Sequence, residues 1–144
     1  MRPAMCIPLL PLIVGAAGCG FLGGGGRTHT KQTRPIAVTL LQKKGSTECE
    51  AKFSGRPQHA FDGDDIAWEF TNACDSDQTV TLAVNPGSTN PFTDPPPWTL
   101  PPIKSGDMAD KVLTVAASAP PGTYKFDIIV LNGKRYDPIL EIDP

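Results

Sequence analysis

Few side chains in this sequence could carry out chemistry on a substrate. The 144 residues include only two histidines, His29 and His59. A catalytic triad needs a histidine base beside its nucleophile, and outside the N-terminal segment only His59 could serve as one. No spacing of serine, histidine and acidic residues points to such a site. We therefore expect no catalytic residues and a protein that is not an enzyme.

The acidic cluster around Gly63 is the other candidate for chemistry. Asp62, Asp64 and Asp65 could be calcium ligands, but they lack the spacing and the bidentate glutamate of a calcium-binding loop. Aspartate and glycine also form tight turns, because the carboxylate can accept a hydrogen bond from nearby backbone. His59 falls in a loop before a strand, with no second imidazole beside it. The sequence therefore predicts no metal site and no cofactor.

The N-terminal segment has the layout of a secretory signal. Arg2 is followed by an apolar run over residues 7–14 and then by small residues, and this run is too short to span a bilayer. Ala16-Ala17-Gly18-Cys19 resembles the lipobox of bacterial lipoproteins, although Ala16 stands where that motif usually has leucine. The resemblance implies cleavage before Cys19 and acylation of its thiol. A plain signal peptide without lipid is the alternative.

The lipobox leaves two cysteines for the folded part of the chain. Cys6 would be removed with the signal and Cys19 would carry the lipid, so Cys49 and Cys74 remain in a chain sent to an oxidising compartment. Neither belongs to a CxxC pair, which disfavours a zinc or redox role. We predict a Cys49–Cys74 disulfide, which by the loop-entropy model stabilises the fold by roughly 3.5 kcal/mol.

The sequence therefore predicts that the chain divides into three segments. These are a signal peptide over residues 1–18, a lipidated, glycine-rich tether over 19–34 and a folded domain over 35–144. The tether has no periodic apolar pattern, which is typical of a flexible linker. We expect a monomer that the lipid anchors in the bacterial cell envelope. Gly20 favours the outer membrane, facing the periplasm or the surface, because inner-membrane lipoproteins of enteric bacteria carry aspartate there. The net charge of −2 provides no basic surface for nucleic acid.

The domain shows strand-like alternation and no long helical period. Apolar residues alternate from Ile66 to Phe70 and should face a core, whereas Asp127, between apolar neighbours, should point outward. Asn132-Gly133 predicts a hairpin between the last two strands, and Pro138 predicts an edge or a bulge in the final one. Seven strands are expected, over residues 36–42, 48–53, 65–71, 78–84, 111–116, 123–131 and 135–142. This pattern predicts an all-β domain, a single Greek-key β-sandwich.

Two motifs of the domain resemble those of cupredoxins, the family of small blue-copper proteins. Gly63-Asp64-Asp65-Ile66-Ala67-Trp68-Glu69-Phe70-Thr71-Asn72 is similar to the strand G-D-x-V-x-W/F-x-x-x-N. Pro121-Gly122-Thr123-Tyr124-Lys125-Phe126 is similar to the segment P-G-x-Y-x-Y/F that opens the copper-binding hairpin. The resemblance covers most of residues 35–144 and implies a cupredoxin-like sandwich. An immunoglobulin-like sandwich would explain the same alternation.

The resemblance does not extend to the copper ligands. A blue-copper site uses two histidines and a cysteine thiolate, usually with an axial methionine. Gln78 stands near the place of the first histidine, and Asp127 to Gly133 contain neither the cysteine nor the second histidine. No Cys, His or Met follows Met108. The resemblance therefore implies a cupredoxin-like domain without copper.

The segment over residues 85–103 is rich in proline, with seven prolines among its 19 residues. A connection of this length within a compact domain is uncommon and often functional. Proline keeps such a segment extended, so Phe92 and Trp98 within it are candidate contacts for a partner. The alternative is that both aromatic side chains fold back and cap one end of the sandwich.

These patterns favour a cell-envelope lipoprotein whose copper-free, cupredoxin-like domain is a non-enzymatic binding or structural module, with an envelope protein or a glycan as its partner. One alternative is a periplasmic metal-binding or electron-transfer protein with atypical ligands such as His59 and the aspartates. Another is an immunoglobulin-like adhesion or glycan-binding module that uses the proline-rich segment.

Overall fold

The computed structural model of the protein describes residues 28–144, which form ten β-strands. The predicted signal peptide, Cys19 and the first part of the tether lie outside these residues. Residues 28–144 contain no helix that is long and apolar enough to cross a membrane. The strands are β1 (Thr33–Gln42), β2 (Cys49–Phe53), β3 (Gln58–Ala60), β4 (Asp65–Ala73), β5 (Thr81–Val84), β6 (Trp98–Thr99), β7 (Met108–Thr114), β8 (Gly122–Ile129), β9 (Arg135–Tyr136) and β10 (Ile139–Ile142).

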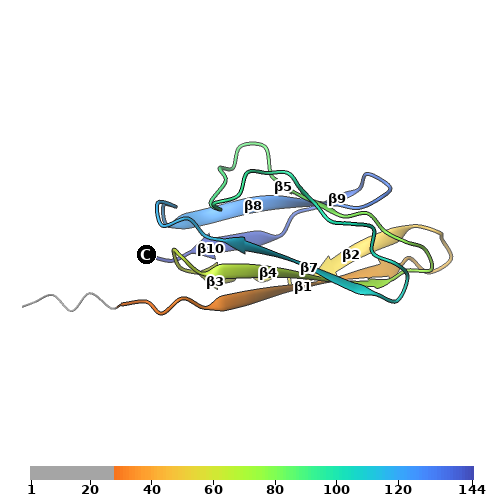
Figure 1. Ribbon diagram of the computed structural model, residues 1–144. Helices are drawn as coiled ribbons and strands as arrows, with labels where there is room; N and C mark the ends of the chain where they lie inside the picture. The colour runs from red at the N-terminus through yellow and green to blue at the C-terminus, as the bar shows by residue number, and fades with distance from the viewer. Residues whose placement is uncertain (1–27) are drawn as a thin grey trace, which may run out of the picture.

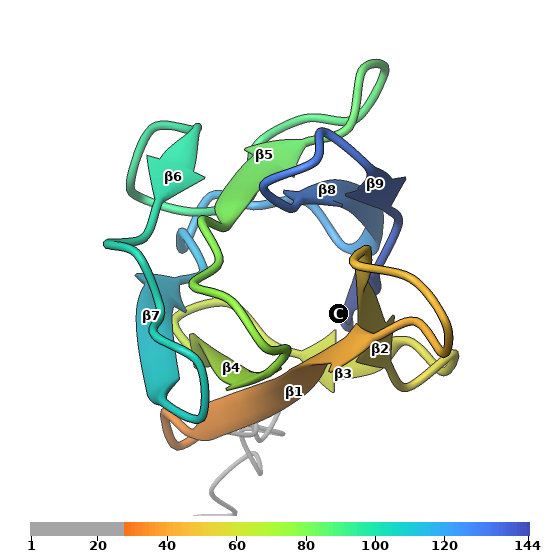
Figure 2. The ribbon, with the colours of Figure 1, turned by 90° about the vertical axis from the view of Figure 1, so that its right-hand side faces the viewer.

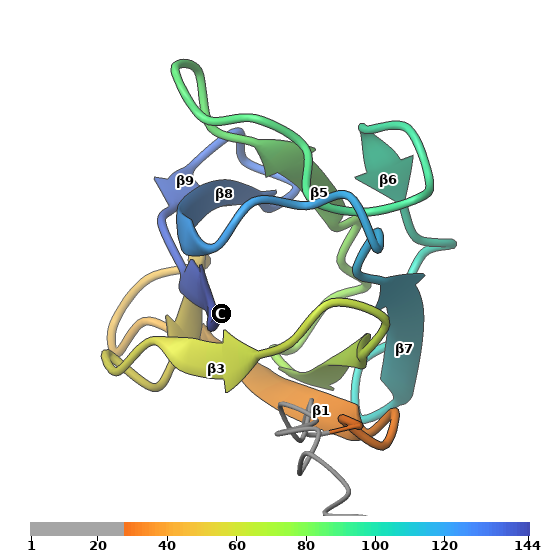
Figure 3. The ribbon, with the colours of Figure 1, turned by 90° about the vertical axis from the view of Figure 1, so that its left-hand side faces the viewer.

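The strands form two sheets that face each other (Figure 1). One sheet has the order β2-β1-β4-β7, and the other has the order β3-β10-β8-β5-β6, with β9 paired to β8. The β1–β4 and β3–β10 pairs are parallel, whereas the remaining pairs are antiparallel. Seen end-on, the two sheets surround a central core (Figures 2 and 3). The prediction of an all-β sandwich is confirmed.

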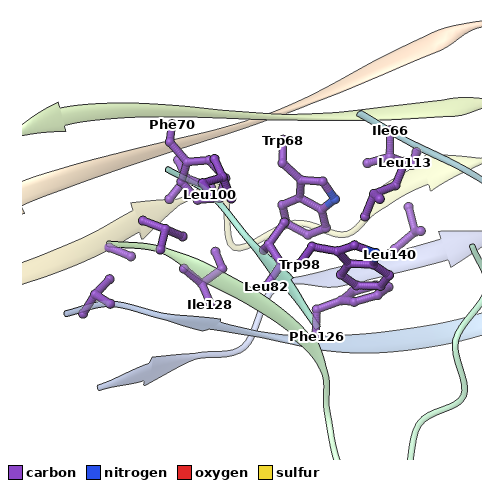
Figure 4. Close-up of a cluster of buried hydrophobic side chains, with 14 of the residues drawn as sticks. Ile66, Trp68, Phe70, Leu82, Trp98, Leu100, Leu113, Phe126, Ile128 and Leu140 are labelled. Carbon is purple, nitrogen blue, oxygen red and sulfur yellow. The ribbon is translucent and has the colours of Figure 1, made fainter. Parts of the chain in front are cut away.

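Large apolar side chains from both sheets fill the space between them (Figure 4). Trp68 and Phe70 of β4 and Phe126 of β8 have no exposed surface. The Trp68 and Phe126 rings meet edge to face, with their centroids 5.6 Å apart, a geometry worth about 0.5–1.5 kcal/mol beyond the burial of the rings. The apolar residues that alternate along β4, Ile66, Trp68 and Phe70, therefore face the core as predicted.

The last predicted strand is divided in two. β9 pairs with β8 and ends at Tyr136, and β10 begins at Ile139, because Pro138 has no N–H to donate to the ladder. The expectation of an edge is wrong for β10, which lies between β3 and β8. The expected bulge is absent as well, because β9 and β10 pair with β8 in one continuous register. The β8–β9 hairpin at Asn132-Gly133 is confirmed, and Gly133 adopts a φ of 77° there.

Two further strands were not predicted. β3 has three residues and β6 has two, which is too short for an alternating pattern to be visible in a sequence. β1 also begins at Thr33, three residues before the predicted strand, because residues 33–35 pair with residues 65–67 of β4. The structured part of the chain therefore reaches into the segment predicted to be a tether.

Candidate functional site

The two segments in which cupredoxins would carry their copper ligands meet at one end of the sandwich. We call it the disulfide end: residues 43–48, 74–78 and 131–134, at the right of Figure 1. Gln78 and Leu131-Asn132 line the same pocket of about 200 Å³ there, although they are more than 50 residues apart in the sequence. Its other lining residues are Thr47, Glu48, Cys49 and Ser76.

The groups that line this pocket do not fit a blue-copper ion. Gln78 is 4% exposed, and its amide nitrogen donates to the hydroxyl of Ser76 at 3.0 Å. Leu131 is 63% exposed and presents only hydrocarbon. Cys49 is joined to Cys74, and a disulfide sulfur is not the thiolate that such a copper site needs. Within the lining of this pocket there is neither an imidazole nor a thiolate.

The predicted disulfide between Cys49 and Cys74 is confirmed. It joins the start of β2 to the loop after β4 and closes a loop of 25 residues, with the two Cα atoms 6.1 Å apart. Both cysteines are buried, at 4% and 2% exposure. The cross-link therefore ties the loop after β4 to β2, the edge strand of its sheet.

Asn72, the asparagine of the first cupredoxin-like motif, organises the same loops. Its side-chain nitrogen donates to the carbonyls of Ser76 at 3.0 Å and Ile103 at 2.8 Å, and its side-chain oxygen accepts from the N–H of Cys74 at 3.0 Å. Asn72 has no exposed surface. The Asn72 side chain therefore holds backbone groups of the surrounding loops in place, so this residue of the motif has a structural role.

A charge pair spans the rim of the pocket. The Nζ of Lys134 lies 2.7 Å from Oε2 of Glu48 and joins the β8–β9 hairpin to the β1–β2 loop. The hydrogen bond from Lys134 lowers the pKa of Glu48, and the same bond raises the pKa of Lys134. Both side chains are more than 40% exposed, so the pair orders the rim without adding much stability.

Asp64, the aspartate of the same motif, is buried at the opposite end of the molecule. One oxygen accepts from Nε2 of His29 at 2.6 Å and from the N–H of Gln32 at 2.8 Å. The other accepts from the N–H of Phe61 at 3.1 Å and from Nε of Arg34 at 3.3 Å. Burial raises the pKa of Asp64, but these four hydrogen bonds outweigh it and hold the pKa below its usual value.

His29 lies in the segment that the sequence predicts to be a flexible tether, yet it is bound to the folded domain. Besides its bond to Asp64, its ring lies over Phe61, with the centroids 4.4 Å apart. Lys31 pairs with Asp65 at 2.9 Å. The hydroxyl of Thr114 and then Lys31 donate to Asp65 and lower its pKa. Residues 29–34 are therefore fastened to the domain by the aspartates that the sequence offered as possible calcium ligands.

Phe92 and Trp98 do not form an exposed contact surface. They are 4% and 5% exposed, and their rings meet edge to face at 5.6 Å. Phe92 also packs on Phe126, and Trp98 pairs with Leu82 of β5 through β6. The idea that they are anchors for a partner is corrected: they fold back into the core, as the alternative had it.

Asp127 was expected to point outward, and the structure shows that its outward-facing carboxylate is nevertheless buried. It points away from the core, as the alternation predicted, yet only 2% of it is exposed. Nδ2 of Asn85 and Nη1 of Arg135 each donate to its carboxylate at 2.8 Å and cover it. The bond from Asn85 joins residues 42 positions apart, which no local pattern shows.

His59 lies on β3 and is not in a loop. Its Nδ1 is 3.2 Å from the carboxylate of Asp143, and its Nε2 is 3.7 Å from Oε2 of Glu141. Neither acidic residue was identified from the sequence, because each is more than 80 positions away from His59. The structure brings the three together through the parallel pairing of β3 with β10.

Comparison with known proteins finds no matching family model and no matching curated protein. Among solved structures, the chain is similar to reduced auracyanin from Roseiflexus castenholzii, at a TM-score of 0.46 and 14% identity over 80% of this chain and 98% of that one. It is also similar to copper nitrite reductase from Nitrosomonas europaea, at a TM-score of 0.44 and 16% identity over 78% of this chain and 42% of that one. A third similar structure is a multicopper oxidase from Pseudomonas thermotolerans. Its TM-score is 0.43 and its identity 11%, over 79% of this chain and 30% of that one.

The chain thus spans nearly all of auracyanin but less than half of the two copper enzymes.

Proposed function

We propose that this chain is a cell-envelope lipoprotein whose cupredoxin-like domain is a copper-free, non-enzymatic binding or structural module. The residues at the disulfide end support the absence of a blue-copper centre. Gln78 and Leu131-Asn132 share one pocket there, and its lining offers amide, hydroxyl, carboxylate, hydrocarbon and disulfide groups. This donor set cannot supply the two imidazoles and the thiolate of a blue-copper centre.

The lipoprotein part rests on the sequence Ala16-Ala17-Gly18-Cys19. The buried Cys49–Cys74 disulfide supports it, because such bonds persist in exported proteins and are rare in reducing compartments. We place the domain as a monomer at the outer membrane, with an envelope protein or a glycan as its partner. The immunoglobulin-like adhesion alternative has less support, since Phe92 and Trp98 are buried and leave the proline-rich segment without exposed aromatic anchors.

Titration with Cu(II) tests the proposal. The disulfide-intact protein should develop no intense thiolate-to-copper absorption, which in blue-copper sites lies at roughly 600 nm. The reduced protein, in which Cys49 and Cys74 are free thiols, is the matched comparison. A blue complex with one copper per chain in the intact protein would overturn the copper-free assignment.

A further inference from the structure

A group of metal-ligating side chains lies away from the disulfide end, on the outer surface of the β3–β10 pair. It consists of His59 on β3, Glu141 on β10 and Asp143 just after β10, and one ligand atom from each lies within 4.8 Å of the other two. Figure 3 shows β3 at the end of the molecule that faces the viewer. Among residues 28–144 this is the one such group of three.

The backbone determines this arrangement. His59 and Glu141 are direct partners in the parallel register of β3 and β10. Asp143 follows Glu141 by two residues, so in extended chain both side chains leave the same face. The N–H of Asp143 donates to the carbonyl of Ala60 at 2.8 Å, which continues the ladder past the end of β10. The three side chains therefore converge from fixed neighbouring positions.

The charges of the group are not balanced within the described chain. Glu141 and Asp143 form no ion pair with a lysine or arginine of residues 28–144, and His59 is their one basic partner there. Two carboxylates around one imidazole leave a local excess of negative charge. A divalent cation would balance that excess and bind directly to all three side chains.

We infer that His59, Glu141 and Asp143 form a binding site for a divalent transition-metal ion of the zinc class. Zinc sits about 2.0–2.2 Å from imidazole nitrogen and carboxylate oxygen, which requires the donor atoms to lie close together. The distance from Nδ1 to Asp143 is 3.2 Å and that from Nε2, the other ring nitrogen, to Glu141 is 3.7 Å. A single ring nitrogen lies within 4.8 Å of an oxygen of each carboxylate. The His59 side chain is 55% exposed and the two carboxylates are 36% exposed, so small rotations can bring one ring nitrogen and both carboxylates onto one ion.

The ligand set also indicates which ions the site takes. An imidazole nitrogen favours zinc and its transition-metal neighbours over calcium and magnesium, which prefer all-oxygen sites. Three protein ligands leave coordination positions open to water, unlike the closed four-ligand sites that support folding. The site is therefore an exchangeable one, and the fold does not depend on its ion.

Calorimetric titration of tag-free, disulfide-intact protein with zinc chloride tests the inference. We expect one zinc per chain and at least tenfold weaker binding in His59→Ala and in Asp143→Asn. His29→Gln is the matched control and should bind zinc as the unaltered protein does, because glutamine can still donate to Asp64. Calcium chloride at the same concentrations should not compete.

The imidazole NMR signals supply a second measurement on the same samples. Zinc should shift the ring signals of His59 and leave those of His29 in place. The inference is overturned if no zinc binds at millimolar concentration, if His59→Ala binds as the unaltered protein does, or if His29→Gln weakens binding equally. None of these outcomes bears on the copper-free assignment, which is measured by absorption at the disulfide end.

Discussion

Replacing Asp64 with asparagine should destabilise the domain and release the chain segment that leads into it. Each carboxylate oxygen of Asp64 accepts two hydrogen bonds, one from a backbone N–H and one from a side chain. The amide of asparagine keeps one oxygen and places an NH₂ group against the other two donors. Whichever way it turns, the backbone N–H of either Gln32 or Phe61 loses its partner.

The size of the effect follows from these contacts. A buried donor left unpaired costs about 1–3 kcal/mol, and hydrogen bonds to a charged group contribute about 1.5–3 kcal/mol each. His29 and Arg34 are 25% and 27% exposed, so the one that loses its bond can turn towards water. We therefore expect Asp64→Asn to lower the free energy of unfolding by about 2–4 kcal/mol, a large part of the 5–15 kcal/mol typical of a domain.

Urea unfolding followed by tryptophan fluorescence measures this change, because Trp68 and Trp98 are both buried in the folded state. Asp62→Asn is the matched control: it removes the same charge from an exposed neighbour and should change the free energy of unfolding by less than about 0.5 kcal/mol. Equal effects of the two substitutions would refute the role assigned to Asp64.

The pH dependence provides an independent check on the same network. Because the pKa of Asp64 is lowered in the folded state, its stabilising contribution is present above the pKa of an unfolded aspartate, about 3.9, and is lost as the pH falls through the folded value. The gap in stability between the unaltered protein and Asp64→Asn should therefore be constant near pH 7 and close below about pH 4. A gap that persists at pH 2 would contradict this account.

Two further predictions concern the core and the cross-link. Reduction or a Cys49→Ala/Cys74→Ala double substitution should cost about 2–5 kcal/mol, and peptide mapping of the unreduced protein should recover Cys49 and Cys74 in one linked species; two alkylatable thiols in the native protein would contradict it. Trp98→Ala should cost about 3–5 kcal/mol in the same urea assay, because Trp98 fills the core against Phe92. A loss below about 0.5 kcal/mol, as for an exposed residue, would restore Trp98 as a surface anchor.

The elements that local patterns determine were predictable from the sequence. Alternation along β4 identified Trp68 as a core residue, and the two motifs pointed to the two segments that meet at the disulfide end. The cysteine inventory identified the Cys49–Cys74 pair. These inferences succeeded because side-chain alternation and the number of available cysteines are properties that a sequence displays directly.

The features that the sequence could not show depend on pairing between distant strands. His59 meets Glu141 and Asp143 only because β3 pairs with β10, and β3 is too short to display a pattern. Asp127 is expected to point outward, but Asn85, 42 residues before it, donates to its carboxylate and helps to bury it. His29 likewise gains its partner from a turn 35 residues away.

We propose that an acylated Cys19 anchors a disulfide-bonded domain without a blue-copper centre. Native mass spectrometry of the detergent-extracted protein from copper-fed bacteria tests it most directly. We expect a chain that begins at an acylated Cys19 and has two hydrogens fewer than its fully reduced form. It should carry no copper at the disulfide end, so that any bound metal is lost in His59→Ala. A free, unmodified N-terminus, or one copper per chain that survives His59→Ala, would contradict it.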